Sequence, residues 1–343
     1  MTFRNTSFFA LIALVLSCVS CEQLLLTPEY ENTPQGVFDA LWNSFDQHYG
    51  GFMVKDINWD SMYTTLSKDI REDMSGEELF DACVSLLSPL KDPHVLLVPM
   101  DIDREIWYGS RKAKLDTLQD FDKDILQENY LSEVKTTDNM FEYGIMEGNI
   151  GYVYIHHFAL NESDTKKEFD EVMEELGSTA GLIFDIRGGF GGEDVSGKGI
   201  ASRFADQSYH YMNTRVKNGP EHDDFTPAVQ WFVEPEGTRY EKPVVMLTNL
   251  QTLSARETFL LAMRVMPQVT QIGDTTAGGF SNANPGELPN GWGYYLSVGE
   301  WTDGNGISYE GKGIAPDILI QNRRPDVLAG KDEVLEKALE VLR

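Results

Sequence analysis

Cysteine is scarce in this sequence, and its three cysteines are not arranged for disulfide bonds. Cys18 and Cys21 lie close together near the N-terminus, and Cys83 is the third among 343 residues. So few cysteines cannot form the disulfide framework of a small secreted domain. Cys83 lies in the helical run from Leu79 to Leu87, where we expect it to be a small buried hydrophobic residue.

Positive charge is also scarce. The chain has 28 lysines and arginines against 55 aspartates and glutamates, which gives a formal net charge of -27. Nucleic acids and anionic lipid surfaces repel such a chain, so we expect neither as a partner. The hydrophobic content of 41% is that of an ordinary globular protein, and 343 residues suffice for one large or two modest domains.

Metal-binding motifs are missing as well. The sequence has no His-Glu-x-x-His run and no cysteine pair with the spacing of a zinc site. It also has no internal repeat and no low-complexity tract. We therefore expect neither a metal ion nor any other cofactor.

The first twenty residues are expected to form a targeting segment. Arg4 provides the positive start, residues 8–16 are apolar, and small residues then lead to Cys21. The apolar run is too short to span a bilayer as a helix. The segment resembles a bacterial lipoprotein signal, in which the cysteine after the cleavage site is lipidated. We favour Cys21 for lipidation, with Cys18 as the alternative.

The lipoprotein resemblance implies where the protein works. It indicates export to the cell envelope and a lipid anchor in the outer membrane of a Gram-negative bacterium, with the side of that membrane left open. Contact with the membrane is then expected only through the N-terminal lipid. Residues 21–33 are polar and lack a hydrophobic period, so they are predicted to be a tether between the lipid and the folded domain.

Three amphipathic helices are predicted after the tether. They cover residues 34–49, 59–70 and 76–87, and Ser75 opens the third with a capping box. Short polar loops join them, which predicts a helical N-terminal subdomain over residues 34–98. Residues 99–148 are mixed in composition, and we interpret them as a linking insertion with a few strands.

A βαβ pattern begins at Gly151. An apolar strand, a helix over residues 163–176 and a second strand over residues 181–186 predict parallel strands joined by a crossover helix. The glycine-rich run from Arg187 to Gly192 follows at once. Such a run allows close approach of the backbone, as in an oxyanion hole, but a simple tight turn explains it equally well.

A serine follows the next predicted strand. Residues 242–249 form a short apolar run, and Ser254 then opens a helix that extends to Met266. Serine at this position faces the positive end of the helix dipole and free N–H groups, which stabilise an alkoxide or an oxyanion. The local pattern also has an ordinary explanation, because Ser254 and Glu257 fit a capping box.

The remaining features are weaker when each is taken alone. His94 is one of six histidines and follows a proline, as many surface-loop histidines do. Residues 289–291 predict a hairpin, residues 309–317 a glycine-punctuated loop, and residues 332–342 a C-terminal amphipathic helix.

Taken together, these runs resemble the tail-specific or C-terminal processing protease family of serine peptidases. The resemblance covers the chain from about residue 35 to its end, apart from residues 100–146. The matching runs are Leu90–His94, Ile150–Val153, Asp185–Gly192, Ser254–Glu257, Gly273–Gly279 and Gly311–Asp317.

One departure from the family pattern indicates the branch. Lysine-dependent members have their general base 25 places after the nucleophile, and that place is Gly279 here. The run from Thr276 to Gly279 resembles instead the tricorn-like and interphotoreceptor-retinoid-binding-protein-like branches, whose base is an N-terminal histidine. This role falls on His94, and the supporting glutamate of the branch falls on Glu310.

The resemblance implies a complete set of catalytic residues. Ser254 would be the nucleophile, His94 the general base, and Glu310 the residue that holds the imidazole tautomer. The main-chain N–H groups of Gly191 and Ala255 would form the oxyanion hole. The implied protein is an exported serine peptidase that hydrolyses peptides or unfolded proteins through an acyl-enzyme.

The implied fold is an α/β fold with a Clp-protease- or crotonase-like core of ββα units over residues 149–343. It has a small helical N-terminal subdomain and no inserted PDZ domain. Pro93 stands where tricorn-type enzymes carry a relay serine, and this favours an alternative function. In that alternative, the chain is a non-catalytic protein that binds peptides or hydrophobic ligands on a protease scaffold. A crotonase-type acyl transfer would leave Ser254 and His94 unexplained, and the oligomeric state is not indicated.

Overall fold

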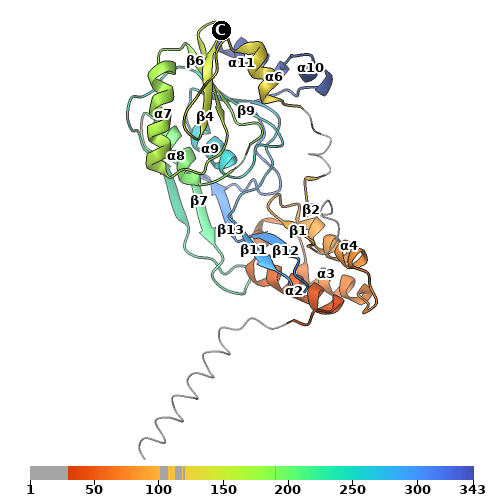
Figure 1. The fold of residues 1–343 in the computed structure, drawn as a ribbon. Coiled ribbons are helices and arrows are strands. Elements are labelled where there is room, and N and C mark those ends of the chain that lie inside the picture. The colour runs from red at the N-terminus through yellow and green to blue at the C-terminus, as the bar shows by residue number, and fades with distance from the viewer. Residues whose placement is uncertain (1–29, 101–106, 113–117, 119, 190) are drawn as a thin grey trace, which may run out of the picture.

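The computed structural model of the chain describes residues 30–100, 107–112, 118, 120–189 and 191–343. The predicted signal segment and most of the predicted tether, with Cys18 and Cys21, lie outside the described residues. The described part has an upper and a lower body, and the C-terminus lies at the top of the upper one (Figure 1). In the described part of the chain, no helix is both long and apolar enough to cross a bilayer.

The lower body contains the three predicted helices, α2 (Pro34–His48), α3 (Trp59–Leu66) and α4 (Gly76–Leu87). Proline at the first position of α2 needs no hydrogen-bond acceptor, and the Thr33 side chain caps the helix at the N–H of Gly36. The predicted capping box of Ser75 and Glu78 is present at α4. Three 3-10 turns complete this region: η1 (Phe52–Val54), η2 (Ser67–Asp69) and η3 (Ser88–Leu90).

A small sheet from distant parts of the chain completes the lower body. Its order is β11 (Ala283–Glu287), β12 (Gly293–Ser297), β1 (Leu96–Val98) and β2 (Tyr108–Gly109). Trp292 and Leu296 share one apolar cluster with residues of α2 and α4. The predicted hairpin around residues 289–291 therefore buries its apolar side against the N-terminal helices.

The upper body is built on a seven-stranded sheet whose central strands are parallel. Strands β3 and β4 are antiparallel at one edge, although they lie in the predicted linking segment. The domain boundaries proposed from the sequence stay predictions. In spatial order the strands are β14 (Ile318–Leu319), β10 (Val269–Gly273), β9 (Val244–Thr248), β6 (Gly181–Asp185), β5 (Ile150–Ile155), β4 (Phe141–Met146) and β3 (Lys135–Thr136).

Helices cover both faces of this sheet (Figure 1). One face packs against α7 (Glu162–Leu176), α8 (Asp194–Ala201) and α9 (Ala255–Arg264). The other packs against α6 (Lys123–Tyr130) and α11 (Glu333–Leu342), and α10 (Arg324–Leu328) lies beside α6.

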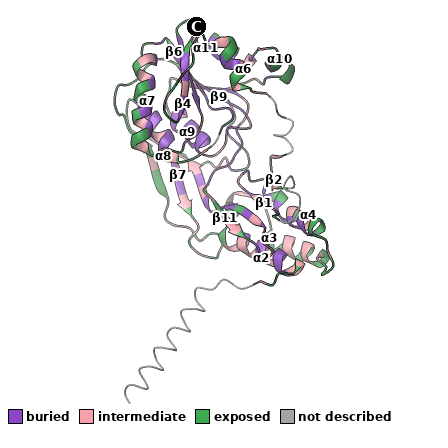
Figure 2. Ribbon diagram, in the orientation of Figure 1, coloured by how far each residue is buried: buried purple, intermediate pink, exposed green. Residues whose placement is uncertain are grey.

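Burial on both faces explains the continuous apolar runs of the central strands. In β6, Leu182 and Phe184 belong to the cluster with α7 and α9, whereas Ile183 belongs to the cluster with α11. Strands β5, β6 and β9 are accordingly buried along their whole length (Figure 2). The predicted α/β fold with a helical N-terminal region is confirmed.

A three-stranded antiparallel sheet extends from the upper body toward the lower one. Its order is β13 (Gly299–Asp303), β7 (Tyr209–Val216) and β8 (Val229–Val233). The loop after β7 reaches the lower body, where His222 Nε2 lies 2.9 Å from Asp46 Oδ1 and the imidazole stacks on Phe52.

Candidate active site

Three loops that follow parallel strands converge at one edge of the main sheet. They are residues 186–189 and 191–192 after β6, residues 249–254 after β9 and residues 274–280 after β10. Since β6, β9 and β10 are neighbours and parallel, their carboxyl ends lie at the same edge. This edge is where α/β sheets usually bind ligands. The topology therefore gathers Gly191, Ser254 and Gly279 from distant parts of the chain.

Ser254 occupies a strained position between β9 and α9. Its φ of 64° and ψ of -130° lie in a region that non-glycine residues rarely adopt. Strain of this kind is concentrated at functional sites, where the surrounding structure maintains it. An ordinary N-cap has an extended backbone, so capping alone does not account for this conformation.

Ser254 and Glu257 occupy the positions of the predicted capping box. Of its two hydrogen bonds, the one with normal geometry is accepted by the Glu257 carboxylate. The main-chain N–H of Ser254 donates to Oε2 of Glu257 at 3.3 Å. The Ser254 hydroxyl is placed toward the N–H of Glu257 without forming a side-chain cap of normal geometry. The serine side chain is therefore not committed to capping the helix.

Glu257 also anchors the loop that follows β10. Its Oε1 accepts hydrogen bonds from the Thr276 hydroxyl and from the N–H of Gly278, and its Oε2 accepts one from the N–H of Gly279 at 2.8 Å. Burial raises the pKa of Glu257 to about 7, while these donors and the N–H of Ser254 oppose the shift. One buried carboxyl group therefore joins the Ser254 turn to residues 276–279.

Gly191 lies directly against Ser254. A Cβ atom built on Gly191 would be 2.8 Å from the Cβ and 3.0 Å from the Oγ of Ser254. The carbonyl of Gly191 accepts a hydrogen bond from the N–H of Phe158 at 2.9 Å, which fixes the orientation of this peptide. Only glycine fits so close to the serine, and the predicted oxyanion loop is next to the predicted nucleophile.

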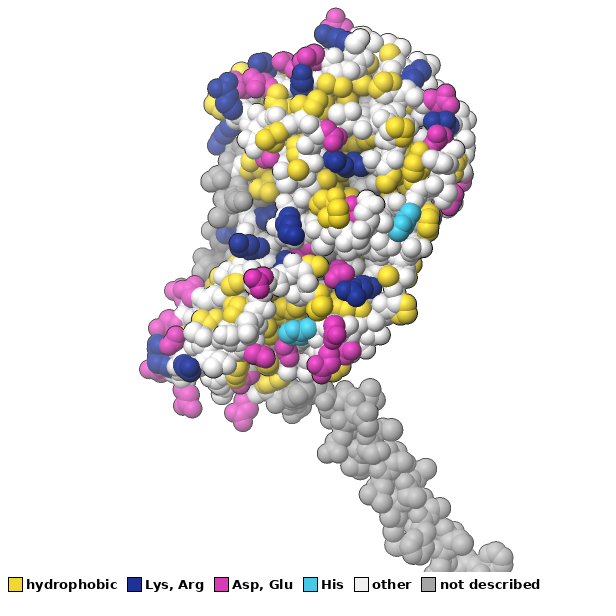
Figure 3. Space-filling model, turned by 180° about the vertical axis from the view of Figure 1, so that it is seen from behind, with side chains coloured by type: hydrophobic (Ala, Val, Ile, Leu, Met, Phe, Trp, Pro, Cys, Tyr) yellow, Lys and Arg dark blue, Asp and Glu magenta, His cyan; other side chains and the backbone are white. Residues whose placement is uncertain are grey.

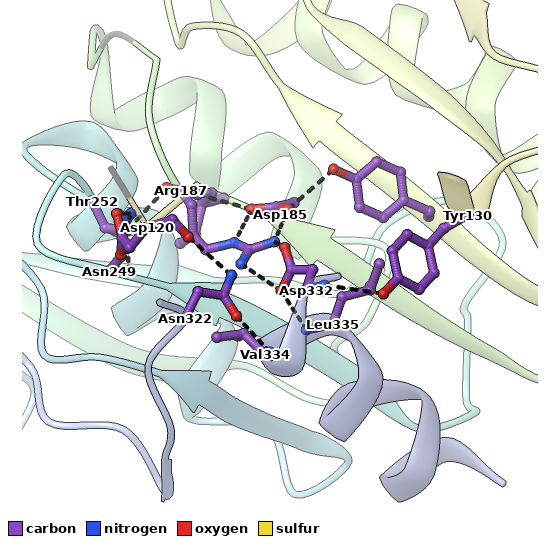
Figure 4. A network of polar contacts seen from close by, with 12 residues as sticks. Asp120, Tyr130, Asp185, Arg187, Asn249, Thr252, Asn322, Asp332, Val334 and Leu335 are labelled. Atoms are coloured by element: carbon purple, nitrogen blue, oxygen red, sulfur yellow. Dashed lines mark hydrogen bonds and ion pairs between the residues drawn. The ribbon is translucent and has the colours of Figure 1, made fainter. Parts of the chain in front are cut away.

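Buried ion pairs hold the start of the glycine-rich loop (Figure 4). Arg187 binds Asp185 through Nε (3.0 Å) and Nη2 (2.7 Å) and binds Asp332, the N-cap of α11, at 2.9 Å. Burial opposes the charge on Arg187, but the two carboxylates overcome this effect and raise its pKa. Thr252 donates from its hydroxyl to the carbonyl of Ile186 at 3.0 Å. This last bond joins the loop before Ser254 to the start of the glycine-rich loop.

His94 reaches this edge from the lower body. A Cβ built on Gly279 would lie 3.4 Å from Cε1 of His94 and would also contact the side chain of Leu253, the residue before Ser254. Burial lowers the pKa of His94, and the charge of Asp92 opposes the shift. The imidazole is therefore neutral near neutral pH, which is the form that a general base requires.

The polar contacts of His94 are incomplete. Its main-chain N–H donates to Oδ1 of Asp92 at 2.8 Å, while Oδ2 of Asp92 accepts from the Tyr49 hydroxyl at 2.9 Å. The ring atom Nδ1 is buried, and no described residue hydrogen-bonds to it. Nor does a hydrogen bond between described residues join the ring to Ser254 or Glu310. The structure brings His94 to the serine loop, and its role as base stays a prediction.

Glu310 is buried near Asp92 and pairs with a lysine. Its Oε1 lies 3.2 Å from Nζ of Lys55, and its Oε2 accepts a hydrogen bond from the N–H of Phe280 at 2.8 Å. Burial and the charge of Asp92 raise the pKa of Glu310, and Lys55 opposes them. Its proposed action on His94 therefore stays a prediction.

Sequence reasoning did not identify Lys55 or the wider role of Glu257. No local pattern marks Lys55, which lies in a turn after α2. Glu257 did carry a signal in the capping box, but that pattern accounts for only one of its four hydrogen bonds. Among the described residues, no group of three or more His, Cys, Asp or Glu side chains is placed to hold a metal ion.

Comparison with known families gives two matches along the chain. Residues 149–320, half of the chain, match Peptidase family S41. Residues 30–88 match the Tricorn protease C1 domain.

Two curated relatives show limited identity. The carboxy-terminal processing protease CtpA of Bacillus subtilis (strain 168) is 28% identical over 177 residues, which are 51% of this chain and 36% of that protein. The tricorn protease of Thermoplasma volcanium is 26% identical over 236 residues, which are 68% of this chain and 20% of that protein. The chain therefore spans only a minor part of the length of these relatives.

Solved structures match nearly the whole chain. A proposed peptidase from Parabacteroides merdae ATCC 43184 has a TM-score of 0.78 and 31% identity, with 91% of this chain and 97% of that chain covered. Mature CPAF complexed with lactacystin has a TM-score of 0.69 at 11% identity, with 90% of this chain and 97% of that chain covered. At that identity the similarity to CPAF concerns the fold alone.

Proposed function

The chain belongs to peptidase family S41, and from this premise we propose that it is a serine peptidase of the C-terminal processing type that cleaves peptide bonds through Ser254. The observation that carries the proposal is the conformation of Ser254, strained at φ 64° with Gly191 packed against its side chain. His94 lies across the neighbouring loop, and its lowered pKa suits a base at neutral pH.

The proposed reaction begins with proton transfer. His94 takes the proton of the Ser254 hydroxyl as its oxygen attacks the substrate carbonyl, and the N–H groups of Gly191 and Ala255 stabilise the oxyanion. His94 then gives the proton to the leaving amine, and the acyl-enzyme forms. Water hydrolyses the acyl-enzyme through the same residues. In other serine proteases each oxyanion donor contributes a factor of about 10²–10³ in rate.

Asp92 is the acidic group whose charge acts on His94, and Glu310 is buried near Asp92. Asp92 favours the protonated imidazole that forms during the reaction. We propose that Glu310 acts on Nδ1 of His94 through a bridging water or hydroxyl, because Nδ1 has no described partner and Pro93 provides no hydroxyl. Hydrogen bonds of this kind often tighten only when substrate binds.

A fluorophosphonate probe tests the nucleophile. The wild-type protein should be labelled on Ser254, as located by mass spectrometry of tryptic peptides. Ser254→Ala should abolish labelling, while Ser281→Ala, which alters a serine on the loop after Gly279, should retain it. Labelling that survives Ser254→Ala would refute the assignment.

Export and lipid attachment belong to the proposal as well. The predicted signal places the lipid on Cys21, and the substrates would be peptides or unfolded proteins of the cell envelope. Growth with an alkyne-labelled fatty acid should label the wild type and Cys18→Ser but not Cys21→Ser. Label on Cys21→Ser but not on Cys18→Ser would assign the lipid to Cys18. A wild-type protein without label would refute the lipid anchor.

A second candidate function rests on the missing relay hydroxyl. Position 93 is proline, and Nδ1 of His94 has no partner among the described residues. As the second candidate we propose a non-catalytic protein that binds peptides or hydrophobic ligands on a protease scaffold. Native mass spectrometry of the purified protein would show a retained ligand in that case. A protein without such a mass that reacts with the fluorophosphonate excludes this candidate.

A further inference from the structure

A cavity beside the candidate active site gathers positive charge. Its volume is about 660 Å³, and its lining includes Lys91, Arg111 and Lys312, with Asp274 as the acidic member. This local excess contrasts with the net charge of -27 for the whole chain. On the face shown in Figure 3, Lys and Arg side chains gather near the middle, where the upper and lower bodies meet.

The cavity adjoins the segments that carry the candidate catalytic residues. Pro93, Thr276 and Gly311 line it, and they lie next to His94, on the loop anchored by Glu257, and next to Glu310, respectively. Burial lowers the pKa of His94, the charge of Asp92 opposes this shift, and the charge of Arg111 adds to it. A molecule bound in the cavity would therefore lie beside the segments that carry His94 and Glu310.

Two buried polar atoms at the cavity have no partner. The Oγ of Ser110 and the Nε of Arg111 are buried, and neither hydrogen-bonds to a described residue. Buried polar atoms are almost always paired, so an unpaired group at a cavity indicates a missing partner. Arg111 is held in place through Nη1, which donates to the carbonyl of Leu250, and this leaves Nε for another acceptor.

The charges of the cavity are open to a ligand. Within the described residues, no ion pair involves Lys91, Arg111 or Lys312. Asp274 is already bonded, because its Oδ1 accepts from the N–H of Thr275 at 2.7 Å and its Oδ2 from the side chain of Gln321 at 2.6 Å. The donors that remain are cationic or hydroxyl groups, and these bind a carboxylate.

We propose that this cavity is a substrate subsite for a carboxylate, which Arg111 and Ser110 bind directly while Lys91 and Lys312 contribute charge at the rim. The proposal rests on the proposed function in so far as the bound molecule is a substrate. The carboxylate has two sources, the C-terminus of a peptide or an acidic side chain, and both present the same acceptor geometry.

Four pools of heptapeptides with an uncharged BODIPY label at the N-terminus distinguish the sources. The pools combine a free or amidated C-terminus with the presence or absence of Asp and Glu, and binding is measured by fluorescence anisotropy on full-chain Ser254→Ala protein, which prevents turnover. A pool with either kind of carboxylate should bind about tenfold tighter than the uncharged amidated pool, as charge-assisted hydrogen bonds predict. Added salt should reduce the difference.

Substitutions in the cavity test which residues cause the preference for carboxylate peptides. Arg111→Gln, Ser110→Ala and Lys312→Gln should each reduce the preference for carboxylate, whereas Lys167→Gln on the exposed side of α7 removes one charge elsewhere and should leave it unchanged. Thermal unfolding checks that each variant is folded. Because Lys312 is exposed and makes no described ion pair, its variant tests the subsite even if Arg111→Gln does not fold.

The outcomes separate this proposal from the proposed function. If the wild-type protein does not react with fluorophosphonate but Ser254→Ala protein prefers the carboxylate pools, the subsite is supported and the proposed peptidase activity is refuted. If the probe reacts and all four pools bind equally, the subsite is refuted and the peptidase remains. Failure of every pool to bind at millimolar concentration, or a preference that survives Lys312→Gln and Ser110→Ala together, also overturns the subsite.

Discussion

Gly191 and Ser254 are so close that a methyl group on the glycine would lie 2.8 Å from the Cβ of the serine. Real Cβ atoms do not approach so closely, so the contact requires glycine at position 191. The two residues are 63 positions apart in the chain, on loops after the neighbouring strands β6 and β9. This contact joins the oxyanion loop to the nucleophile in the proposed mechanism, and the first prediction tests it.

Gly191→Ala should reduce kcat/KM by a factor of about 10²–10³, the loss that follows removal of one oxyanion donor. The added methyl group must displace either the loop or the Ser254 side chain. Steady-state hydrolysis of a peptide substrate measures the effect. Gly293→Ala is the control, because no atom lies within 4 Å of a Cβ built there. Full activity of Gly191→Ala would exclude this loop from the oxyanion hole.

Lys55→Met should destabilise the fold by about 3–5 kcal/mol, because it leaves the buried carboxyl of Glu310 without its cation. Urea unfolding measures the change. The double variant Lys55→Met/Glu310→Gln should recover part of the loss, since it removes the unpaired charge. Equal stability of wild type and Lys55→Met would show that the pair contributes nothing to the fold.

Glu257→Gln should weaken the dependence of stability on pH. Burial raises the pKa of Glu257 to about 7, above its value in the unfolded chain. The folded state therefore binds more protons, and this contribution to stability is full below about pH 4.3 and is lost as the pH rises through 7. Urea unfolding at pH 5 and pH 8 should show a smaller difference for Glu257→Gln than for the wild type.

The same variant should be less stable than the wild type at both pH values. Glutamine presents an NH₂ group to a position where four donors meet two carboxylate oxygens, which costs about 1–3 kcal/mol. Asp317→Asn, at a half-exposed carboxylate, is the matched control. A pH dependence unchanged by Glu257→Gln would contradict the assignment of the raised pKa.

The acidic limb of the pH profile of kcat/KM should lie below the ordinary histidine pKa of about 6.5. Burial lowers the pKa of His94, so its neutral form persists to lower pH. Asp92→Asn should shift the limb further down, since Asp92 opposes the effect of burial. His48→Gln, at the exposed end of α2, should leave the limb in place. A limb above pH 7 would indicate that another group acts as base.

Local patterns in the sequence predicted several helices and turns of the fold. The apolar period of helix α2, the capping box at Ser75 and the hairpin around residues 289–291 all depend on neighbours within a few positions. The resemblance to the family motifs also proposed Ser254, His94 and Gly191 as site residues, and their catalytic roles stay predictions. Such information survives in a linear sequence because the interactions that it describes are short in the chain.

The cross-connections of the site were not predictable in this way. Lys55 and Glu310 are 255 positions apart, and neither has a neighbour in sequence that indicates the other. Strand β12 of the predicted hairpin likewise pairs with β1, although the two strands are far apart in the sequence. Strands β3 and β4 lie in a segment of mixed composition, where the alternation of apolar residues is short and weak.

By itself, the sequence determined the main helices and the central strands, the glycine-rich run after a buried strand, and the presence of glycine, not lysine, at position 279. Only the tertiary structure decided that Glu257 binds the N–H groups of Ser254 and Gly279 at once, and that Arg111 and Ser110 share a cavity with the rim of the site. The physical reason is that helices, caps and turns arise from contacts within a few residues. Burial, ion pairing and unpartnered donors depend instead on which distant segments the fold brings together.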